Sequence, residues 1–206
     1  MIGAGGHAKV LASLVRLAGF RLTGVCDPAL VAAGTTQWQG VPVLGDDDAL
    51  ASLDRHAVGI VNGIGRMPGK DLRRIVFERV QEMGFHFPAL VHPQAWVDES
   101  VKLADGVQIM AGCMVQPDCS IGVNSVINTR AGIDHDCHVG AHVHIAPGTT
   151  LCGGVRVGDH TFVGTGSTII QGVSVGANAM IAAGSLLTCD VPDNARTRSV
   201  PARITG

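Results

Sequence analysis

The chain has 206 residues, of which 46% are apolar and 16% charged, and its formal net charge at pH 7 is −2. So few charges on so apolar a chain exclude an intrinsically disordered protein, and the lack of a basic surplus argues against nucleic-acid binding. Glycine accounts for 28 residues, aromatic residues make up only 3%, and tyrosine is absent. This composition favours many short strands and tight turns over a core built on large rings.

No targeting or redox signal stands out in the sequence. No apolar run reaches the roughly 18 residues that span a bilayer, and the N-terminus lacks the charged and apolar blocks of a signal peptide. The six cysteines form no CxxC pair and no metal-ligand spacing. The sequence therefore predicts a cytoplasmic protein with no membrane segment and no metal, whose cysteines are small buried residues.

Residues 1–91 alternate between helical and extended patterns. Such an alternation predicts a small, Rossmann-like parallel sheet with flanking helices, an α/β domain. The predicted strands cover residues 21–26, 57–61 and 87–91, an extended piece covers 40–45, and the predicted helices cover 9–17, 46–53 and 69–83.

A glycine-rich turn stands in front of the first predicted helix. Gly3 and Gly5 begin it, and Asp27 ends the next predicted strand about 20 residues later, a spacing similar to that of a dinucleotide-binding turn. The turn continues with His7 and Ala8, so it departs from the full GxGxxG pattern, and a tight turn without a ligand is the alternative. Only two residues precede Gly3, so either the start codon is assigned too far downstream or the sheet begins unusually short.

From residue 97 to residue 187, every sixth residue is valine, isoleucine or leucine. These three types make up about a quarter of the chain, so an unbroken run of this length has a chance probability on the order of 10⁻¹⁰. The positions are Val97, Leu103, Ile109, Val115, Ile121, Ile127, Ile133, Val139, Ile145, Leu151, Val157, Val163, Ile169, Val175, Ile181 and Leu187.

We interpret each hexad as one short strand and one tight turn of a triangular prism. The aliphatic side chain points inward, and a small residue two positions earlier, such as Cys113 or Thr149, fits the corner. Glycines that follow the aliphatic site, such as Gly122 and Gly140, would supply backbone angles that other residues resist. Three hexads make one coil, which predicts an all-β helix over residues 92–188 and a C-terminal tail over 189–206.

The repeat resembles that of the hexapeptide acyltransferases, whose repeats form a left-handed parallel β-helix. The GAGGHAK opening, the small β/α domain and the C-terminal β-helix are together similar to the sialic-acid O-acetyltransferases and the bacillosamine and perosamine N-acetyltransferases. Residues 127–137 match the perosamine type best. The resemblance covers essentially the whole chain and implies acetyl-CoA as the co-substrate.

Four of the nine histidines fall between residues 135 and 144. Histidine suits a general base because its ordinary pKa lies near neutral pH. His135 stands two residues after Ile133, at a corner where a side chain can point outward. The resemblance assigns the general base to His135 and makes Asp136 the acid that orients its ring; a solvated corner histidine is the alternative.

The resemblance also assigns an active-site position to Asn128 and contact with the acetyl thioester to His144. His144 lies half a coil from His135, so the two would not meet in one chain. In a trimer of parallel prisms they could face one cleft, and we therefore predict a homotrimer with threefold symmetry.

Gly153 lies one coil above His135. By resemblance, it leaves the cleft open and offers its N–H to the thioester oxyanion. Gly172 and Ala183 would line a slot for the pantetheine arm of CoA. The arginines of the tail, at positions 196, 198 and 203, would meet CoA phosphates or merely solubilise the tail.

His142 and His160 lie one coil apart and should stack on each other. We interpret them, together with His138, as surface or interface residues. A histidine metal site is the rival interpretation, although no acidic or cysteine ligand stands at a suggestive spacing.

The nucleotide sugar is predicted to bind the N-terminal domain. The backbone N–H groups of Gly5, Gly6 and His7 precede a helix and can face phosphate oxygens. Asp27 ends the next strand, and Asn62 and Gly63 end the strand after it, at the edge of a parallel sheet where ligands usually bind.

These observations together predict a sugar N-acetyltransferase of polysaccharide biosynthesis. It would move acetyl from acetyl-CoA to the amino group of a nucleotide-linked amino-deoxysugar, a GDP-perosamine-like or UDP-amino sugar, in a direct ternary-complex reaction. O-acetylation of a sialic-acid-like sugar is the alternative. A second alternative is a β-helix protein that binds sugar nucleotides without catalysing a reaction.

Overall fold

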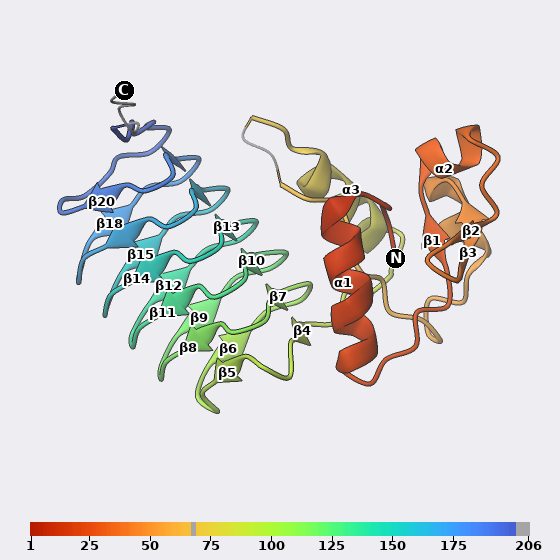
Figure 1. Ribbon diagram of the computed structural model, residues 1–206, viewed down its shortest axis with the longest axis horizontal. Coiled ribbons are helices and arrows are strands. Elements are labelled where there is room, and N and C mark those ends of the chain that lie inside the picture. The colour runs from red at the N-terminus through yellow and green to blue at the C-terminus, as the bar shows by residue number, and fades with distance from the viewer. Residues whose placement is uncertain (67–68, 201–206) are drawn as a thin grey trace, which may run out of the picture. The chain divides into compact units, whose positions relative to one another are not determined.

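The computed structural model describes residues 1–66 and 69–200. The chain divides into two compact units, Met1–Pro93 and Gln94–Gly206 (Figure 1). In the first unit, helices and short strands follow one another. They are α1 (Gly6–Leu17), β1 (Val25–Cys26), α2 (Pro28–Ala32), β2 (Gln37–Trp38), β3 (Val41–Gly45), the 3-10 helix η1 (Asp47–Ser52), α3 (Leu72–Glu82) and β4 (Leu90–Val91).

The sheet of the first unit is centred on Ile2. This residue forms parallel bridges to Cys26 on one side and to Asn62 on the other, and β1 pairs in parallel with β3. β2 then pairs antiparallel with β3, so the predicted parallel sheet carries one antiparallel strand at its edge. The reason is a two-residue hairpin turn at Gln39 and Gly40, both at positive φ, which fits the right-handed twist of the strands.

Helix α1 begins at Gly6, three residues before the predicted start. It buries one apolar stripe, formed by Ala8, Leu11, Ala12, Leu14 and Val15, at the spacing of an amphipathic helix. Helix α3 packs Phe77 on Phe87, with ring centroids 4.4 Å apart.

Three further elements of the first unit differ from the prediction. The acidic segment near residue 47 forms a 3-10 helix instead of an α-helix. The strand predicted over 57–61 is reduced to the single bridge at Asn62. The strand predicted over 21–26 shortens to β1, so the first unit has shorter strands than hydrophobic patterning suggested.

The second unit is a left-handed parallel β-helix; the hexad repeat predicted the solenoid, and the family resemblance predicted its handedness. Its stacked coils are visible in Figure 1. Each strand has two residues, and paired residues lie one 18-residue coil apart, as Val126 and His144 do. Successive strands belong in turn to three sheets. The first sheet contains β5 (Trp96–Val97), β8 (Met114–Val115), β11 (Gly132–Ile133), β14 (Thr150–Leu151), β17 (Thr168–Ile169) and β20 (Leu186–Leu187), and the second contains β6 (Lys102–Leu103), β9 (Ser120–Ile121), β12 (His138–Val139), β15 (Arg156–Val157) and β18 (Ser174–Val175). The third sheet includes β7 (Gln108–Ile109), β10 (Val126–Ile127), β13 (His144–Ile145), β16 (Phe162–Val163) and β19 (Met180–Ile181).

The core of the β-helix consists of the residues that the hexad singled out. Every aliphatic position from Ile109 to Leu187 is buried and is the second residue of its strand. The small residues two positions earlier are buried as well, and their hydroxyl or thiol groups donate to backbone carbonyls, as Ser125 does to Gly140 at 2.8 Å. Among the cysteines, Cys189 is exposed and Cys152 half-buried, which corrects the expectation that all are buried.

The glycines that follow the aliphatic sites are needed for a different physical reason from the one predicted. Their φ values are not positive; instead, a Cβ at Gly122 would lie 2.5 Å from the carbonyl carbon of Gly140 in the next coil. From Ile109 to Leu187, positive φ occurs three residues before each aliphatic site, where glycine, asparagine, aspartate, histidine and arginine all occur. Asp136, at φ 60°, is one of these.

Candidate functional site

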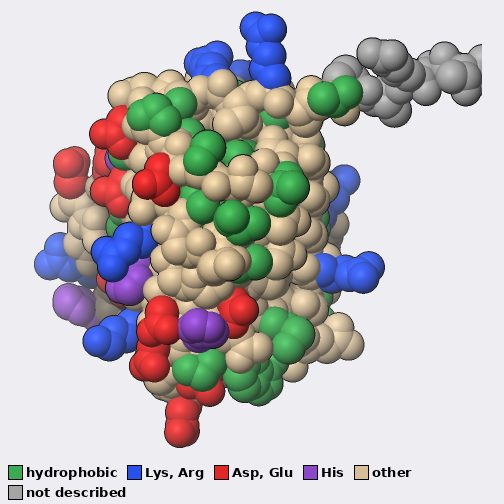
Figure 2. Space-filling model, turned by 90° about the vertical axis from the view of Figure 1, so that its left-hand side faces the viewer, with side chains coloured by type: hydrophobic (Ala, Val, Ile, Leu, Met, Phe, Trp, Pro, Cys, Tyr) green, Lys and Arg blue, Asp and Glu red, His purple; other side chains and the backbone are tan. Residues whose placement is uncertain are grey.

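His135 and Asp136 lie together in the turn between β11 and β12. The Nδ1 atom of His135 is 2.7 Å from Oδ2 of Asp136, and both side chains are largely exposed. The backbone N–H of His135 also donates to Oδ1 of Asp134 at 2.8 Å. Figure 2 shows a histidine side chain among acidic side chains on the face in view. The two neighbouring residues thus form a hydrogen-bonded pair at the surface, which is an ion pair when His135 is protonated.

The acidic neighbours raise the pKa of His135 above its ordinary value. The hydrogen bond to Asp136 contributes most, followed by the charge of Asp134. The carboxylate of Asp136 accepts a hydrogen bond from the Nδ1–H group, so Nε2 carries the lone pair when the ring is neutral. The pair therefore suits a general base that acts through Nε2.

Gly153 provides the space that the His135 ring occupies. A Cβ built on Gly153 would lie 2.7 Å from both Cε1 and Nε2 of His135. Gly154 donates its N–H to the carbonyl oxygen of His135 at 2.8 Å, which fixes the two coils against each other. In the described part of the chain the N–H of Gly153 donates to no backbone carbonyl, so it remains a candidate oxyanion donor.

Asn128 and His144 form a second group. Their Nδ2 and Nε2 atoms are 3.5 Å apart, and the Asn128 Oδ1 accepts the backbone N–H of Thr129 at 2.8 Å. His144 is buried and its ring stacks on Phe162, with centroids 5.1 Å apart. Packing thus holds the His144 ring in one orientation.

The two groups occupy different corners of the prism. Asn128 lies in the turn before β11, and His135 lies in the turn after it. Gly172 donates its N–H to the Gly153 carbonyl at 2.9 Å and so belongs to the His135 corner. Ala183, in the turn after β19, belongs to the Asn128 corner, because β10, β13 and β19 share one sheet. The predicted acetyl-CoA residues are therefore divided between two corners of one chain.

The residues predicted for the nucleotide sugar lie at one edge of the first unit. The carboxylate of Asp27 accepts N–H groups from Ala4 at 2.7 Å and from Ala29 and Leu30, so it also caps α2. Gly5 is the N-cap of α1, no side chain caps this helix, and its first turn has no acidic residue. Gly5 and Gly6 are exposed, and His7 is half-buried. The N-terminus of α1 is therefore an electropositive surface suited to phosphate.

Asn62 and Gly63 reach the same edge but serve the fold. Asn62 is buried, and its Nδ2 donates to the carbonyl oxygen of Arg73 at 2.9 Å. Arg73 in turn donates to the carbonyl oxygens of Asn62 and Ile64, and burial lowers its pKa to about 9. At Gly63 a Cβ would lie 2.7 Å from the Ile2 carbonyl oxygen. Sequence reasoning missed Arg73, because a helical arginine is ordinarily exposed.

The chain was compared with known proteins. The PglD N-terminal domain matches residues 1–80, and a hexapeptide repeat of succinyl-transferase matches residues 154–189. A structure of GDP-perosamine N-acetyltransferase from Caulobacter crescentus in complex with CoA and GDP-perosamine is 38% identical, with a TM-score of 0.87, and the match covers 100% of this chain and 95% of that one. The chain belongs to the hexapeptide-repeat sugar acetyltransferases of the perosamine and bacillosamine type.

Other structures agree with this assignment. The acetyltransferase domain of PglB from Neisseria gonorrhoeae, in complex with acetyl coenzyme A, is 34% identical with a TM-score of 0.84, over 95% of this chain and 92% of that one. WeeI from Acinetobacter baumannii, at 23% identity, a TM-score of 0.75 and coverage of 99% and 97%, shares the fold. A comparison with curated proteins finds no significant match. This family member is an acetyl-CoA-dependent sugar N-acetyltransferase.

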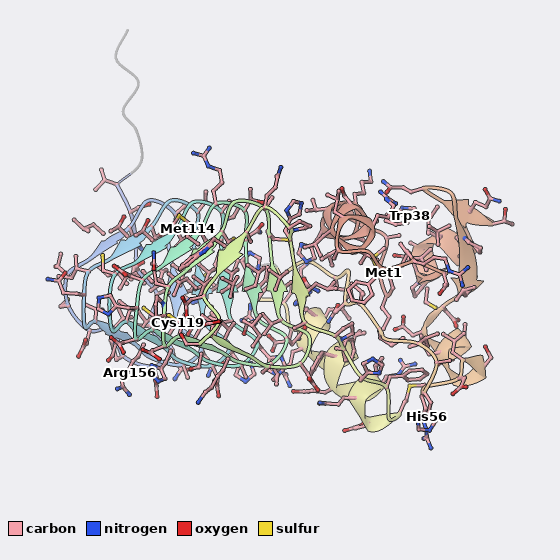
Figure 3. The ribbon with its side chains drawn as sticks, turned by 90° about the horizontal axis from the view of Figure 1, so that it is seen from below. Met1, Trp38, His56, Met114, Cys119 and Arg156 are labelled. Atoms are coloured by element: carbon pink, nitrogen blue, oxygen red, sulfur yellow. The ribbon has the colours of Figure 1, made fainter. Side chains whose placement is uncertain are left out.

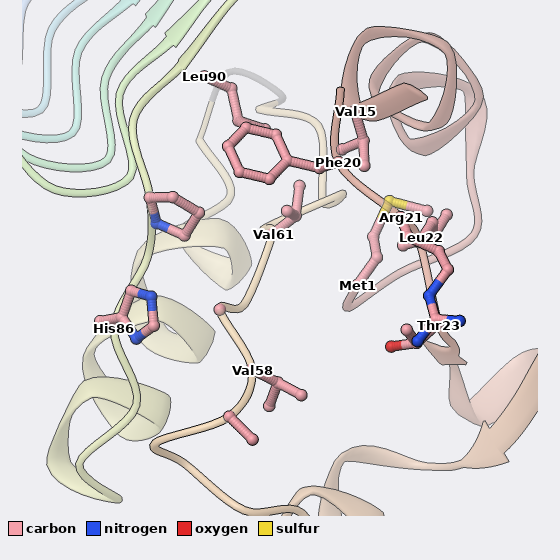
Figure 4. A pocket seen from close by; sticks show the side chains of 13 residues that line it. Met1, Val15, Phe20, Arg21, Leu22, Thr23, Val58, Val61, His86 and Leu90 are labelled. Carbon is pink, nitrogen blue, oxygen red and sulfur yellow. The ribbon is translucent and has the colours of Figure 1, made fainter. Parts of the chain in front are cut away.

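A cavity of about 260 Å³ lies in the first unit of this acetyltransferase, away from the predicted sugar-nucleotide edge. Met1, Leu22, Thr23, Val58 and His86 are among its lining residues (Figure 4). They precede the strands, whereas Asp27 and Gly63 follow them. The cavity is therefore not the edge at which parallel sheets usually bind ligands.

The remaining histidines do not join the site. His142 and His160 stack as predicted, with centroids 5.1 Å apart, and Nδ1 of His142 is 3.0 Å from the Asn124 amide. Within residues 1–66 and 69–200, no group of three or more histidine, cysteine or acidic side chains is placed to hold a metal ion. In the same ranges no helix has the length and apolar character needed to cross a bilayer.

The tail contributes two exposed arginines, Arg196 and Arg198. Arg196 forms a bridge with Met180, which holds it against the last coils. Arg203, predicted to meet a CoA phosphate, lies outside the described residues.

Proposed function

We propose that this enzyme acetylates the amino group of a nucleotide-linked amino-deoxysugar, either GDP-perosamine-like or UDP-linked. The observation that carries the proposal is the His135–Asp136 pair seated over Gly153, in a chain similar over its full length to a GDP-perosamine N-acetyltransferase. The pair supplies a base beside an open glycine corner, as acetyl transfer to an amine requires.

The proposed reaction is a direct transfer within a ternary complex. The amine nitrogen attacks the thioester carbonyl carbon, and Nε2 of His135 accepts the proton that the nitrogen loses as the new C–N bond forms. The N–H of Gly153 donates to the oxyanion. The C–S bond then breaks, the CoA thiolate leaves, and the proton held by His135 can pass to it.

Asp136 is the positioning residue in this scheme. Its carboxylate holds the Nδ1 proton of His135 and stabilises the imidazolium that forms during the reaction. The same contact raises the pKa of the ring, so His135 is a stronger base than an isolated histidine. The fraction of neutral ring at a given pH is correspondingly smaller.

We place acetyl-CoA between two copies of the chain in a homotrimer. His144, Asn128 and Ala183 would come from one copy, and His135, Gly153 and Gly172 from the next. The support is the division of these residues between two corners of one chain. Arg196 and Arg198 lie near the last coils, where the nucleotide end of CoA would meet them.

We place the nucleotide sugar on the first unit. Its phosphates would face the N–H groups of Gly5, Gly6 and His7 at the uncapped start of α1. Asp27 and the loop at Asn62 and Gly63 shape the same edge, since both contact residues 2–4. The six free cysteines agree with a cytoplasmic enzyme.

The test is a CoA-release assay with three acceptors: GDP-perosamine, a UDP-linked amino sugar and a sialic acid. We expect turnover with one of the two amino sugars, and mass spectrometry should show an added acetyl amide. Release with sialic acid alone would contradict the proposed acceptor and indicate O-acetylation. Binding of all acceptors without CoA release would contradict catalysis.

A further inference from the structure

A buried arginine lies at the edge that we propose for the sugar nucleotide. Arg73 belongs to the first turn of α3, and only 4% of its surface is exposed. Its Nη1 group donates to the carbonyl oxygens of Asn62 at 2.9 Å and of Ile64 at 2.8 Å. The Asn62 amide donates to the Arg73 carbonyl oxygen at 2.9 Å and accepts the backbone N–H of Ile64 at 3.2 Å. The two side chains therefore fix the conformation of the loop that follows Asn62.

This loop, residues 62–66, packs on the beginning of α1. A Cβ at Gly63 would lie 2.9 Å from the Cβ of Ala8, and a Cβ at Gly65 would lie 3.3 Å from that of His7. In Figure 3, α1 (red) and α3 (yellow) lie on opposite sides of the first unit. The loop thus contacts the first turns of both helices, and its backbone separates the buried guanidinium from the first turn of α1.

Two arginines and two acids determine the charge at this edge. Arg66 ends the loop and is half-buried, and burial lowers the pKa of its guanidinium, whereas the charge of Asp71 raises it. Burial first and the charge of Arg66 second lower the pKa of Arg73 to about 9, so this side chain still carries its charge at neutral pH. The carboxylate of Asp27 adds a negative charge beside the turn before α1.

Two cations withdrawn from water favour an anionic ligand. Burying a charge costs free energy, and a nearby anion offsets this cost because little water screens the attraction. The N-terminus of α1 offers N–H donors to phosphate oxygens but only about half a unit of positive charge. A sugar linked through a diphosphate carries one more negative charge than a sugar linked through a single phosphate. The two guanidinium groups therefore favour the diphosphate.

We propose that Arg66 and Arg73 make this edge selective for sugars that are linked to a nucleoside diphosphate. Arg73 acts through the loop, both as a positioning residue and as a buried charge, and Arg66 adds a second charge at the end of the loop. This inference rests on the proposed function, because it requires the sugar nucleotide to bind the first unit. It deepens that proposal by naming the residues that distinguish the two kinds of linkage.

The test is a set of calorimetric titrations with guanosine, GMP and GDP, and with uridine, UMP and UDP. Arg73→Gln keeps a donor for the carbonyl oxygens of the loop but removes the charge. We expect the ratio of diphosphate affinity to nucleoside affinity to fall about tenfold, with nucleoside affinity within about twofold of wild type. A residue that only shaped the loop would lower both affinities by the same factor, so an unchanged ratio would overturn the proposal.

The matched control is Arg74→Gln, which removes the same charge from the next residue of α3. The Arg74 guanidinium lies at the surface, 2.9 Å from Glu78 and 3.5 Å from Asp71. The affinity ratio should therefore stay close to that of the wild type. A fall as large as in Arg73→Gln would show a general effect of net charge and would overturn the assignment to the loop.

Two further variants cover the case in which Arg73→Gln does not fold. Arg73→Lys keeps a charge and a donor and should keep the wild-type ratio, whereas Arg66→Gln should lower the ratio. A wild-type ratio in Arg66→Gln, or a lowered ratio in Arg73→Lys, would overturn the proposal.

The CoA-release assay on the wild-type enzyme tests the proposed function separately. Release with sialic acid alone would contradict the proposed acceptor. An enzyme that acetylates an amino sugar but binds the nucleoside and its diphosphate equally well would overturn only the inference about Arg66 and Arg73.

Discussion

His135 and Asp136 are neighbours in sequence, whereas Gly153 joins them only through the coil repeat. The ring of His135 occupies the space that a Cβ at Gly153 would fill, so ring position depends on both residues. Asp136 adopts a left-handed backbone conformation, which aspartate tolerates better than most residues. In the proposed reaction, the His135 site therefore combines a general base, a residue that positions it and the space that Gly153 leaves for the ring.

The first prediction concerns the base. His135→Ala should lower kcat by roughly 10²- to 10⁴-fold, the range for loss of a general base. Because the side chain is exposed, the oligomeric mass and the CoA affinity should not change. His138→Ala is the matched control: it removes an exposed histidine three residues away and should keep wild-type turnover. More than a tenth of wild-type turnover in His135→Ala would place the base elsewhere.

The second prediction concerns pH. His135 accepts a proton only when neutral, so activity should fall as the pH drops below its raised pKa. Asp136→Asn removes the largest cause of that raised pKa. The acid limb of kcat/KM should therefore move to lower pH, while the plateau rate falls because the ring is a weaker base. An acid limb that stays in place would show that His135 is not the titrating group.

At the scale of the elements, the coil repeat depends on two kinds of turn position. One kind requires a left-handed backbone and tolerates several residue types, including Asp136 and His142. The other requires close approach between coils and is filled by the glycine column Gly122, Gly140, Gly158 and Gly176, where a Cβ would meet the next coil or the chain that follows it. Alanine substitutions at the two kinds of turn position should therefore change the free energy of unfolding by different amounts.

Gly122→Ala should destabilise the β-helix by about 3 kcal/mol, because its Cβ would overlap backbone that cannot move away. Gly148→Ala has open space and only the left-handed backbone to oppose it, so about 1 kcal/mol is expected. Denaturant unfolding of both variants measures the difference. A larger loss in Gly148→Ala would contradict this account of the glycine column.

The start of α1 provides the fourth prediction. No atom lies within 4 Å of a Cβ at Gly5, so Gly5→Val should fold normally while covering the exposed N–H groups. Affinity for the sugar nucleotide should fall at least tenfold, about 1.4 kcal/mol, with unchanged acetyl-CoA affinity in calorimetric titrations. Equal affinities for the sugar nucleotide would contradict phosphate binding at this turn. Asp27→Ala is a weaker test, because Asp27 also caps α2.

At the scale of the whole molecule, a site shared between copies makes a prediction of its own. His135→Ala and the double variant Asn128→Ala/His144→Ala should each be impaired in every site of their own trimers. After subunit exchange at equal amounts, about a quarter of the interfaces would combine two intact halves, so about a quarter of wild-type activity should return.

The control for subunit exchange mixes His135→Ala with Asp136→Ala. Both changes lie in the same half of the site, so no interface becomes intact and activity should stay low. Recovery in this control, or none in the first mixture, would contradict a shared site.

The sequence by itself determined the β-helix, because each aliphatic residue of the hexad is buried by its own coil and the coils above and below it. The position of Gly153 one coil above His135 follows from the same repeat, and Asp136 is the next residue in the chain. The hairpin at Gln39 and Gly40 could have been predicted, because glycine is typical of the second position of a two-residue hairpin turn. Strand lengths in the first unit could not be predicted, because the bridge near the predicted strand 57–61 is formed by Asn62 with the distant Ile2.

Only the tertiary structure decided the roles that depend on contacts between distant segments. Asn62 and Gly63 lie at the predicted edge, but Arg73 donates to the carbonyl oxygen of Asn62, and the Ile2 backbone packs closely against Gly63. No local sequence pattern encodes these contacts. The division of the acetyl-CoA residues between two corners likewise emerges once each turn is assigned to its sheet. Periodicity specifies what is buried along one chain, whereas side-chain contacts across coils decide which surfaces remain for substrates and for other copies.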